Sequence, residues 1–256
     1  MARFEGKSVV ITGATGDIGP AVARHFAAEG ARLGLTYRAR REQAEALARE
    51  LGSPGRSVVL VPADLLVPTE AVGAEVRRAA AALLAALGGV DVLVALAGYP
   101  ATPELWQRPF ENVTATDLHA AFAVDTVGTF LFAQALAPAL RAARGSIVVM
   151  SSSAALYGDT LGLLYAPAKC ANAGLVKVLA RVLAPEVRVN GVAPGAVDSA
   201  WVATLTEEQR VRAVSTSLLG RLGRPDEIAR LIADLASPGF VNGRLVAADG
   251  GIFPRS

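Results

Sequence analysis

The chain has 256 residues, of which 52% are hydrophobic and 19% are charged, and its formal net charge is +2. This length and apolar content suit one domain over residues 1–256 with a full core. Because the charge is near neutral and the arginines are scattered, we expect no nucleic-acid partner. The single cysteine excludes an intrachain disulfide.

The start of the chain is charged and enters a strand at once, which is not the pattern of a secretory signal. The apolar run Arg77–Val90 is too short to span a bilayer and is better interpreted as a buried helix that leads into a strand. We therefore expect a cytoplasmic protein with no membrane segment.

A strand, a glycine-rich turn and a helix open the chain. Lys7–Ile11 is typical of a buried strand and Pro20–Glu29 of a helix, and the turn between them contains Gly13, Gly16 and Gly19. Glycines let the backbone approach a phosphate closely, and the free amides at a helix start point at the anion. The pattern predicts a pyrophosphate cradle. A tight turn without a ligand is the alternative.

The second predicted strand, Leu33–Tyr37, indicates the choice of cofactor. In such α/β folds a carboxylate at the end of this strand commonly holds the ribose hydroxyls of NAD, and it would repel a 2′-phosphate. Here Tyr37 occupies that place and Arg38, Arg40 and Arg41 follow. Arg38 is the best candidate to bind the phosphate through its planar fork. We expect NADP(H) to be preferred over NAD(H), the alternative being a solvated basic helix start.

Five further β-rich runs alternate with helical stretches along the chain. They are Ser57–Val61, Val90–Val94, Ser146–Met150, Val187–Val192 and Leu245–Ala248. Seven strands separated by helices predict an α/β fold, a Rossmann-type doubly wound sheet of mostly parallel strands with helices on both faces. Open sheets of this kind bind ligands at the carboxyl ends of their strands. The motifs should therefore converge on one crevice.

Ser152, Tyr165 and Lys169 form a possible proton-transfer trio. Tyr165 and Lys169 are four residues apart, and Ser152 lies thirteen residues before Tyr165, just after an apolar run. Residues at i and i+4 share a face of a helix, so the ammonium can sit beside the phenol and favour its ionised form. Such a phenol can act as a general acid and base. An isolated Tyr–Lys pair is more often a solvated helix face.

Together and in this order, the motifs resemble the classical short-chain dehydrogenase/reductase family over about residues 5–252. The late run Leu219–Ala236 is similar to a helix of bacterial 3-oxoacyl-[acyl-carrier-protein] reductases. The other segments that match the family are Pro62–Leu65, Asp91–Gly98, Val189–Gly195 and Ala248–Gly251.

The resemblance implies an NADPH-dependent oxidoreductase (EC 1.1.1.-) that reduces a ketone, 3-oxoacyl or a related carbonyl, to a secondary alcohol. Tyr165 would donate the proton, Lys169 would also hold the nicotinamide ribose, and Ser152 would orient the substrate oxygen. Small-molecule substrates, no metal and a homotetramer are implied as well, although composition cannot exclude a dimer. The cofactor-binding residues implied are Gly13, Thr15, Gly16, Asp17, Ile18, Gly19, Tyr37, Arg38, Asp64, Leu65, Ala97, Gly98, Tyr165, Lys169, Pro194, Gly195, Val197 and Ser199.

Several positions depart from the family pattern. Asp17 replaces a glycine of the phosphate turn, which is unfavourable unless its carboxylate turns away or caps the helix. Ala95 and Leu96 replace two asparagines that brace the central strands, which could loosen the cofactor floor. Asp125 replaces an asparagine of a catalytic proton relay, and a carboxylate there would raise the pKa of Lys169. A structural Asp125 that holds a water is the alternative.

The substrate side is less specified by the sequence. Residues 198–217 should form a short helical lid in which Trp201 faces the substrate or pins the lid, and Tyr99, Trp106 and Tyr157 could line the opposite wall. Pro167 indicates a helix that begins just before Tyr165, because proline is tolerated only in the first turn. Besides the ketone reductase, an alcohol or polyol dehydrogenase working oxidatively and a catalytically weakened dinucleotide-binding regulator remain open.

Overall fold

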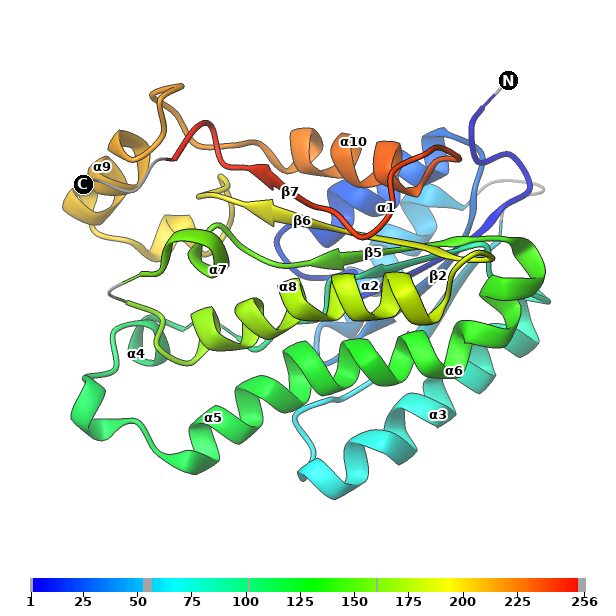
Figure 1. Ribbon diagram of the computed structural model, residues 1–256, viewed down its shortest axis with the longest axis horizontal. Helices are drawn as coiled ribbons and strands as arrows, with labels where there is room; N and C mark the ends of the chain where they lie inside the picture. The colour runs from blue at the N-terminus through cyan, green and yellow to red at the C-terminus, as the bar shows by residue number, and fades with distance from the viewer. Residues whose placement is uncertain (1, 53–56, 101, 160, 253–256) are drawn as a thin grey trace.

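The computed structural model describes residues 2–52, 57–100, 102–159 and 161–252, and these form a sheet between two layers of helices (Figure 1). Within the described residues all strand pairs of the seven-stranded sheet are parallel, in the order β3-β2-β1-β4-β5-β6-β7. The predicted fold class is confirmed. The strands are β1 Ser8–Thr12, β2 Arg32–Tyr37, β3 Val58–Pro62, β4 Val92–Ala95, β5 Ser146–Met150, β6 Arg188–Pro194 and β7 Leu245–Ala248.

The helices cover both faces of the sheet. One face packs against α3, α6 and α8, and the other against α1, α2 and α10 (Figure 1). The α-helices are α1 Gly19–Ala28, α2 Arg41–Leu51, α3 Thr69–Leu87, α4 Pro103–Trp106, α5 Ala115–Phe122, α6 Gly128–Ala143, α7 Ala154–Tyr157, α8 Tyr165–Val182, α9 Glu207–Ser215 and α10 Pro225–Ala236. Short helical turns are η1 Phe110–Asn112, η2 Ala123–Val127 and η3 Val202–Thr204.

The central strands are buried along their whole length and mostly apolar, because helices cover both of their faces. Every residue of β1 and β5 is buried. Such continuous runs are typical of parallel sheets, whereas a sheet with one wet face shows alternation. Two cores result, one on each side of the sheet, and Phe132 and Phe26 are among their largest fully buried side chains. These cores fix the strand ends that carry the predicted motifs.

The strand order reverses at β1, which pairs with β2 on one side and β4 on the other. Thr12 at the end of β1 is in register with Ala95 at the end of β4. The turns that follow these two strands therefore meet, and the crevice between them is where doubly wound sheets bind ligands. In Figure 1 the tips of β5 to β7 point toward the same side, where α4, α7 and α9 lie.

One described segment, Ala115–Ala143, is long and apolar enough to cross a bilayer, with a mean hydropathy of 1.5. Half of its most apolar window is buried inside the protein. Its α6 part packs against α3 and contributes Phe132, Leu136 and Leu140 to the core. A core helix of a globular domain explains this composition.

Candidate active site

The glycine turn after β1 folds as a close-approach loop. Gly13 has a φ of +67°, and a Cβ atom there would lie 2.8 Å from Ala97 Cα. A Cβ atom on Gly19 would lie 2.5 Å from the Ala14 carbonyl oxygen, whereas one on Gly16 would meet only the Gly13 oxygen, at 3.2 Å. The close backbone contacts therefore leave no room for a side chain at position 13 or 19. Gly16 is exposed at the mouth of the turn.

The start of α1 is open to an anion. Ile18 is its N-cap residue and provides no side-chain hydrogen bond. Pro20 lies in the first turn, where a backbone N–H would have no partner within the helix, so its absence costs nothing. Asp17, the residue before this N-cap, is exposed. The first amides of a helix require an acceptor, and a phosphate group would supply one. The cradle thus fits a dinucleotide pyrophosphate.

Thr12 holds the two central turns together. Its buried hydroxyl oxygen accepts hydrogen bonds from the amides of Leu96 and Ala97, both at 3.1 Å. The sequence predicts a looser floor here because two asparagines are replaced by Ala95 and Leu96. The structure instead shows that a side chain on the neighbouring strand braces this segment. The only signal in the sequence is a threonine at the end of the first strand.

Two consecutive serines after β5 have different roles. Ser151 Oγ is buried and donates to the carbonyl oxygen of Lys169 at 2.9 Å, which docks α8 against the end of the sheet. Ser152 Oγ accepts from the Ala154 amide at 3.2 Å, and its hydroxyl proton is not used in that bond. Ser152 is 8% exposed, and its neighbour Ser151 is 1% exposed. Of the two, Ser152 is therefore the serine that can meet a ligand.

Tyr165 and Lys169 lie on one face of the first turns of α8. Lys169 Nζ is 5.2 Å from the centroid of the Tyr165 ring. As the sequence predicts, α8 begins at Tyr165 and Pro167 lies in its first turn. The ammonium is therefore placed beside the phenol by helical spacing alone.

A buried ion pair completes this arrangement. Lys169 Nζ is 2.5 Å from Asp125 Oδ1, and both side chains are almost wholly buried. Asp125 Oδ2 accepts from the Tyr99 amide at 2.8 Å. Gly98 lies over the pair, since a Cβ atom there would be 3.3 Å from Asp125 Oδ1. A side chain at position 98 would crowd the two charged groups.

The pKa of Lys169 is raised. Burial by itself lowers the pKa of this ammonium, but attraction to the carboxylate of Asp125 and to Tyr165, together with the hydrogen bond to Asp125, outweighs burial. This is the direction that the sequence predicts for a carboxylate at position 125. The ammonium therefore keeps its charge at neutral pH.

Asp125 belongs to a π-helical turn, η2, between α5 and α6. Such turns are rare and are frequent at functional sites, because they shift one residue out of helical register. The hydroxyl of Thr126, in the same turn, donates to the Ala168 carbonyl oxygen at 3.2 Å. The hydroxyl of Thr129 donates to the Asp125 carbonyl oxygen at 2.7 Å. The turn is thus fastened to α8 at the residue before Lys169.

The residues predicted for the adenosine end of the cofactor lie beyond β2 and β3. Arg38 is exposed, and within the described part of the chain it has no hydrogen bond or ion pair. Arg40 is directed to the glycine turn, where it donates to the Thr15 carbonyl oxygen at 3.0 Å, and Arg41 pairs with Glu45 at 2.8 Å. The guanidinium of Arg38 is therefore the one available to a ligand.

Asp64 and Leu65 differ in exposure. Asp64 is exposed, and its Oδ1 accepts from the Leu66 amide at 2.9 Å. Leu65 is buried, and its side chain lies where a Cβ atom of Gly128 would fall. Leu65 can therefore meet a cofactor only through its backbone. Tyr37 is half-buried, and its carbonyl oxygen accepts from the Ala63 amide at 2.8 Å.

The late motif borders the other end of the crevice. The Pro194 carbonyl oxygen accepts from the Ser153 amide at 2.8 Å, which joins β6 to the segment after Ser152. Gly195 packs against Asp249, and a Cβ atom there would lie 2.9 Å from Asp249 Cα. Val197 is buried and forms an isolated β-bridge with Gly223, and Ser199 is half-buried near the start of the predicted lid, residues 198–217.

The four aromatic residues predicted for the substrate side have different surroundings. Tyr99 packs partly against the core under α3 and α6. Tyr157 on α7 is 39% exposed, and desolvation together with the nearby Asp249 carboxylate raises the pKa of its hydroxyl. Trp201, at the lid, has its ring centroid 4.9 Å from that of Trp106. Trp106 in turn lies 5.4 Å from the Tyr165 ring.

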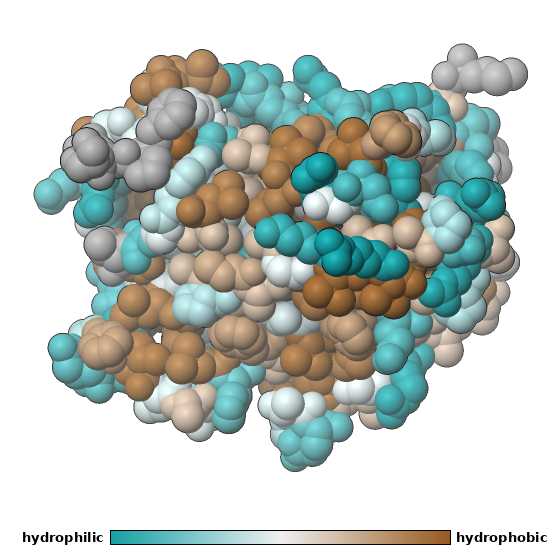
Figure 2. All heavy atoms as spheres, viewed as in Figure 1, coloured by the Kyte–Doolittle hydropathy of each residue, from teal (hydrophilic) through white to brown (hydrophobic). Residues whose placement is uncertain are grey.

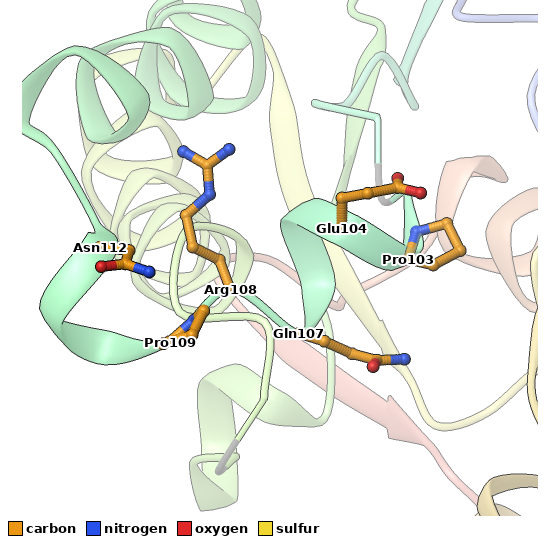
Figure 3. A pocket seen from close by; sticks show the side chains of 6 residues that line it. All are labelled: Pro103, Glu104, Gln107, Arg108, Pro109 and Asn112. Atoms are coloured by element: carbon orange, nitrogen blue, oxygen red, sulfur yellow. The ribbon is translucent and has the colours of Figure 1, made fainter.

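An open groove of about 570 Å³ lies beside α4 and is lined by Pro103, Glu104, Gln107, Arg108, Pro109 and Asn112 (Figure 3). None of the predicted site residues lines it. Arg108 in this groove already pairs with Asp117 at 2.6 Å. Among the residues that the structure describes, no cluster of three or more His, Cys, Asp or Glu side chains could hold a metal ion.

A family model described as Enoyl-(Acyl carrier protein) reductase matches residues 13–252. The chain belongs to the short-chain dehydrogenase/reductase family. The 3-oxoacyl-[acyl-carrier-protein] reductase FabG of Thermotoga maritima is 33% identical over 255 residues, covering 98% of this chain and 99% of that protein. The cis-4-hydroxycyclohexanecarboxylate dehydrogenase of Sinomonas cyclohexanicum is 35% identical over 252 residues, covering 97% of each.

Solved structures agree with this assignment. A short-chain dehydrogenase from Burkholderia cenocepacia, crystallised in complex with NADP, superimposes with a TM-score of 0.87 at 30% identity, covering 97% of this chain and 98% of that one. As a member of this family, the chain is an oxidoreductase that acts on a carbonyl or alcohol group and binds a nicotinamide dinucleotide. The predicted family resemblance is confirmed.

Proposed function

We propose that this short-chain dehydrogenase/reductase reduces a ketone, 3-oxoacyl or a related carbonyl, to a secondary alcohol with NADPH. The observation that carries the proposal is the line of three groups Tyr165, Lys169 and Asp125, with Lys169 Nζ 5.2 Å from the Tyr165 ring centroid and 2.5 Å from Asp125. A phenol beside a buried ammonium of raised pKa is an acid whose conjugate base is stabilised by a neighbouring charge.

The dinucleotide, when bound, supplies the hydride to the carbonyl carbon. Tyr165 gives its hydroxyl proton to the carbonyl oxygen, so that hydride and proton together make the alcohol. Ser152, whose hydroxyl proton is free of the Ala154 bond, holds the same oxygen. Lys169 stabilises the phenolate left on Tyr165, and Asp125 keeps Lys169 charged and in place.

The preference for NADP(H) rests on the end of β2. Arg38 is exposed just after β2, while its neighbours Arg40 and Arg41 are engaged with Thr15 and Glu45. A free guanidinium suits a 2′-phosphate, and Tyr37 at the preceding position adds no repelling carboxylate. Pro194, Gly195, Val197 and Ser199 complete the nicotinamide end of the proposed site.

We also propose a cytoplasmic homotetramer. Apolar side chains are exposed on the outer faces of α6 and α8, among them Phe130 (39%), Val178 (53%) and Val182 (61%). Figure 2 shows hydrophobic surface over these helices. Contact between copies would bury it. Light scattering is expected to give four times the chain mass, and a monomer would contradict this part of the proposal.

Oxidation of NADPH by a panel of 3-oxoacyl thioesters and cyclic and open-chain ketones tests the proposal. We expect turnover in the native protein and its loss in Tyr165→Phe, by about a thousandfold or more, with NADPH binding retained. Ser152→Ala should also lower turnover, because it removes the hydroxyl that holds the substrate oxygen. Ser151→Ala is its matched control, because the Ser151 hydroxyl donates to the backbone of α8. Undiminished turnover by Tyr165→Phe would refute the assignment. NADPH binding without any turnover would favour a dinucleotide-binding regulator.

A further inference from the structure

Three aromatic rings form a row that includes the proposed catalytic tyrosine, Tyr165. The Trp106 ring lies 5.4 Å from Tyr165 at an interplanar angle of 57°, and 4.9 Å from Trp201 at 67°. These rings come from α4, the start of α8 and the lid, which are far apart in sequence. The chain has only two tryptophans, and both belong to this row.

A glycine makes room for the row. Gly162 has a φ of +67°, and a Cβ atom there would lie 2.7–3.0 Å from three carbons of the Trp106 ring. Its amide donates to the Trp106 carbonyl oxygen at 2.8 Å, and its own carbonyl oxygen accepts from the Tyr165 amide at 2.9 Å. The backbone of one residue thus ties Trp106 to the first turn of α8.

The lid holds Trp201 at the other end of the row. Val202, the next residue, is 2% exposed, which anchors the start of the lid in the protein. Thr204 donates to the Trp201 carbonyl oxygen through its hydroxyl at 2.7 Å. Trp201 itself stays partly exposed. Trp201 is therefore held in place by its neighbours, and its exposed part can meet a ligand.

Charge near the lid does not favour a phosphate-bearing carrier. The lid segment 198–217 contains three carboxylates, Asp198, Glu207 and Glu208, and two guanidinium groups, Arg210 and Arg212. Electrostatic complementarity to an anionic carrier would require an excess of positive charge there. The side chains next to Tyr165 are instead the aromatic rings of Trp106 and, beyond it, Trp201.

From these contacts we infer that Trp106 and Trp201 form an aromatic wall that selects ring-bearing ketones or alcohols, with Trp106 also a positioning residue for Tyr165. The inference rests on the proposed function and narrows its substrate class. Indole faces bind flat or alicyclic rings by close contact over their area, and a rigid ring loses less conformational freedom on binding than an open chain. A substrate oxygen at Tyr165 leaves its carbon frame beside this wall.

A pair of ketones with the same number of carbons tests the wall. We compare kcat/KM for cyclohexanone and hexan-2-one in the native protein, Trp201→Leu, Trp201→Phe and Trp106→Leu. The ratio of cyclohexanone to hexan-2-one should fall roughly tenfold in Trp201→Leu, mainly through KM, and recover in part in Trp201→Phe. Trp106→Leu should lower the ratio and also lower kcat for both ketones, because it frees the Tyr165 ring.

Phe110→Leu is the matched control, because Phe110 is 79% exposed on η1 and lies outside the row. It should leave the ratio unchanged. An equal loss of kcat/KM for both ketones in Trp201→Leu would mean that the tryptophan only supports the fold, and it would overturn the inference.

A binding measurement separates this inference from the proposed function. Both tryptophans lie in the wall, so their fluorescence in Tyr165→Phe with NADP⁺ reports occupation of this site without turnover. Cyclohexanol should change the emission at concentrations at which hexan-2-ol does not. If cyclohexanol alone changes the emission but the native protein reduces no ketone, the aromatic wall is supported and the proposed function is overturned. If the native protein reduces ketones through Tyr165 but both alcohols change the emission equally, the proposed function is supported and the aromatic wall is overturned.

Discussion

Lys169 Nζ lies 2.5 Å from Asp125 Oδ1 in a region where both side chains are almost wholly buried. Removal of one partner of such a buried ion pair strongly destabilises the folded protein, because the other charge stays buried without a counter-charge. Here the pair also sits under Gly98 and beside Tyr165. Its charge balance therefore bears on both folding and catalysis.

Asp125→Asn is expected to move the alkaline limb of the reduction profile to lower pH. The native pKa of Lys169 is raised, so the contribution of its charge is fully present below the ordinary value of 10.5 and is lost only above it. Without the carboxylate, burial lowers that pKa and the ammonium is lost earlier. Measurement of kcat from pH 6 to 11 should show a shift of about one unit or more.

The same variant should lose about 3 kcal/mol of unfolding free energy at pH 7. Asp226→Asn on α10 is the control, because its carboxylate is exposed and pairs with Arg224 at the surface. Superimposable pH profiles of the native protein and Asp125→Asn would count against a role of Asp125 in catalysis.

Thr12→Val is expected to destabilise the protein by about 1–3 kcal/mol, because the amides of Leu96 and Ala97 lose a buried acceptor. It should also weaken NADPH binding, since Gly13 packs directly on Ala97. Urea unfolding and a NADPH titration measure the two effects. Thr12→Ser keeps the hydroxyl but lacks the methyl group, and it should retain most of the stability and of the NADPH affinity; losses as large as those of Thr12→Val would mean that the two hydrogen bonds are not responsible.

Arg38→Ala is expected to lower kcat/KM for NADPH about tenfold or more and to leave the value for NADH nearly unchanged, since a charge-assisted bond to the 2′-phosphate is lost. Arg41→Ala is the control. It removes a nearby guanidinium that is paired with Glu45, and it should leave kcat/KM unchanged for both NADPH and NADH. Equal or better efficiency of the native protein with NADH would contradict the proposed preference.

Glu227→Gln should lower the Tm at pH 7 and have little effect near pH 2. Its side-chain bonds to Arg221 and the backbone amide of Arg224 lower the pKa of Glu227 to about 2 from 4.5. A lowered carboxyl pKa stabilises the fold above pH 4.5, and this contribution is lost as the pH falls toward 2. Thermal unfolding across this range measures it. Glu42→Gln, exposed in the first turn of α2, is the control.

Much of the fold could be predicted because the relevant signals are local. Continuous apolar runs predict strands buried on both faces, and β1 and β5 are fully buried. The i, i+4 spacing places Lys169 beside Tyr165 once that segment is helical, and Pro167 indicates where the helix begins.

The sequence by itself thus determined the individual strands, the glycine turn and the placement of Tyr165 beside Lys169, since each depends on residues a few positions apart. Only the tertiary structure decided that Thr12 braces Leu96 and Ala97, that Arg38 rather than Arg40 is free, and that Trp106 joins Tyr165 to Trp201. These contacts join residues between 25 and 95 positions apart. No periodicity of the chain encodes them, because they arise where separate strands and helices end at the same edge of the sheet.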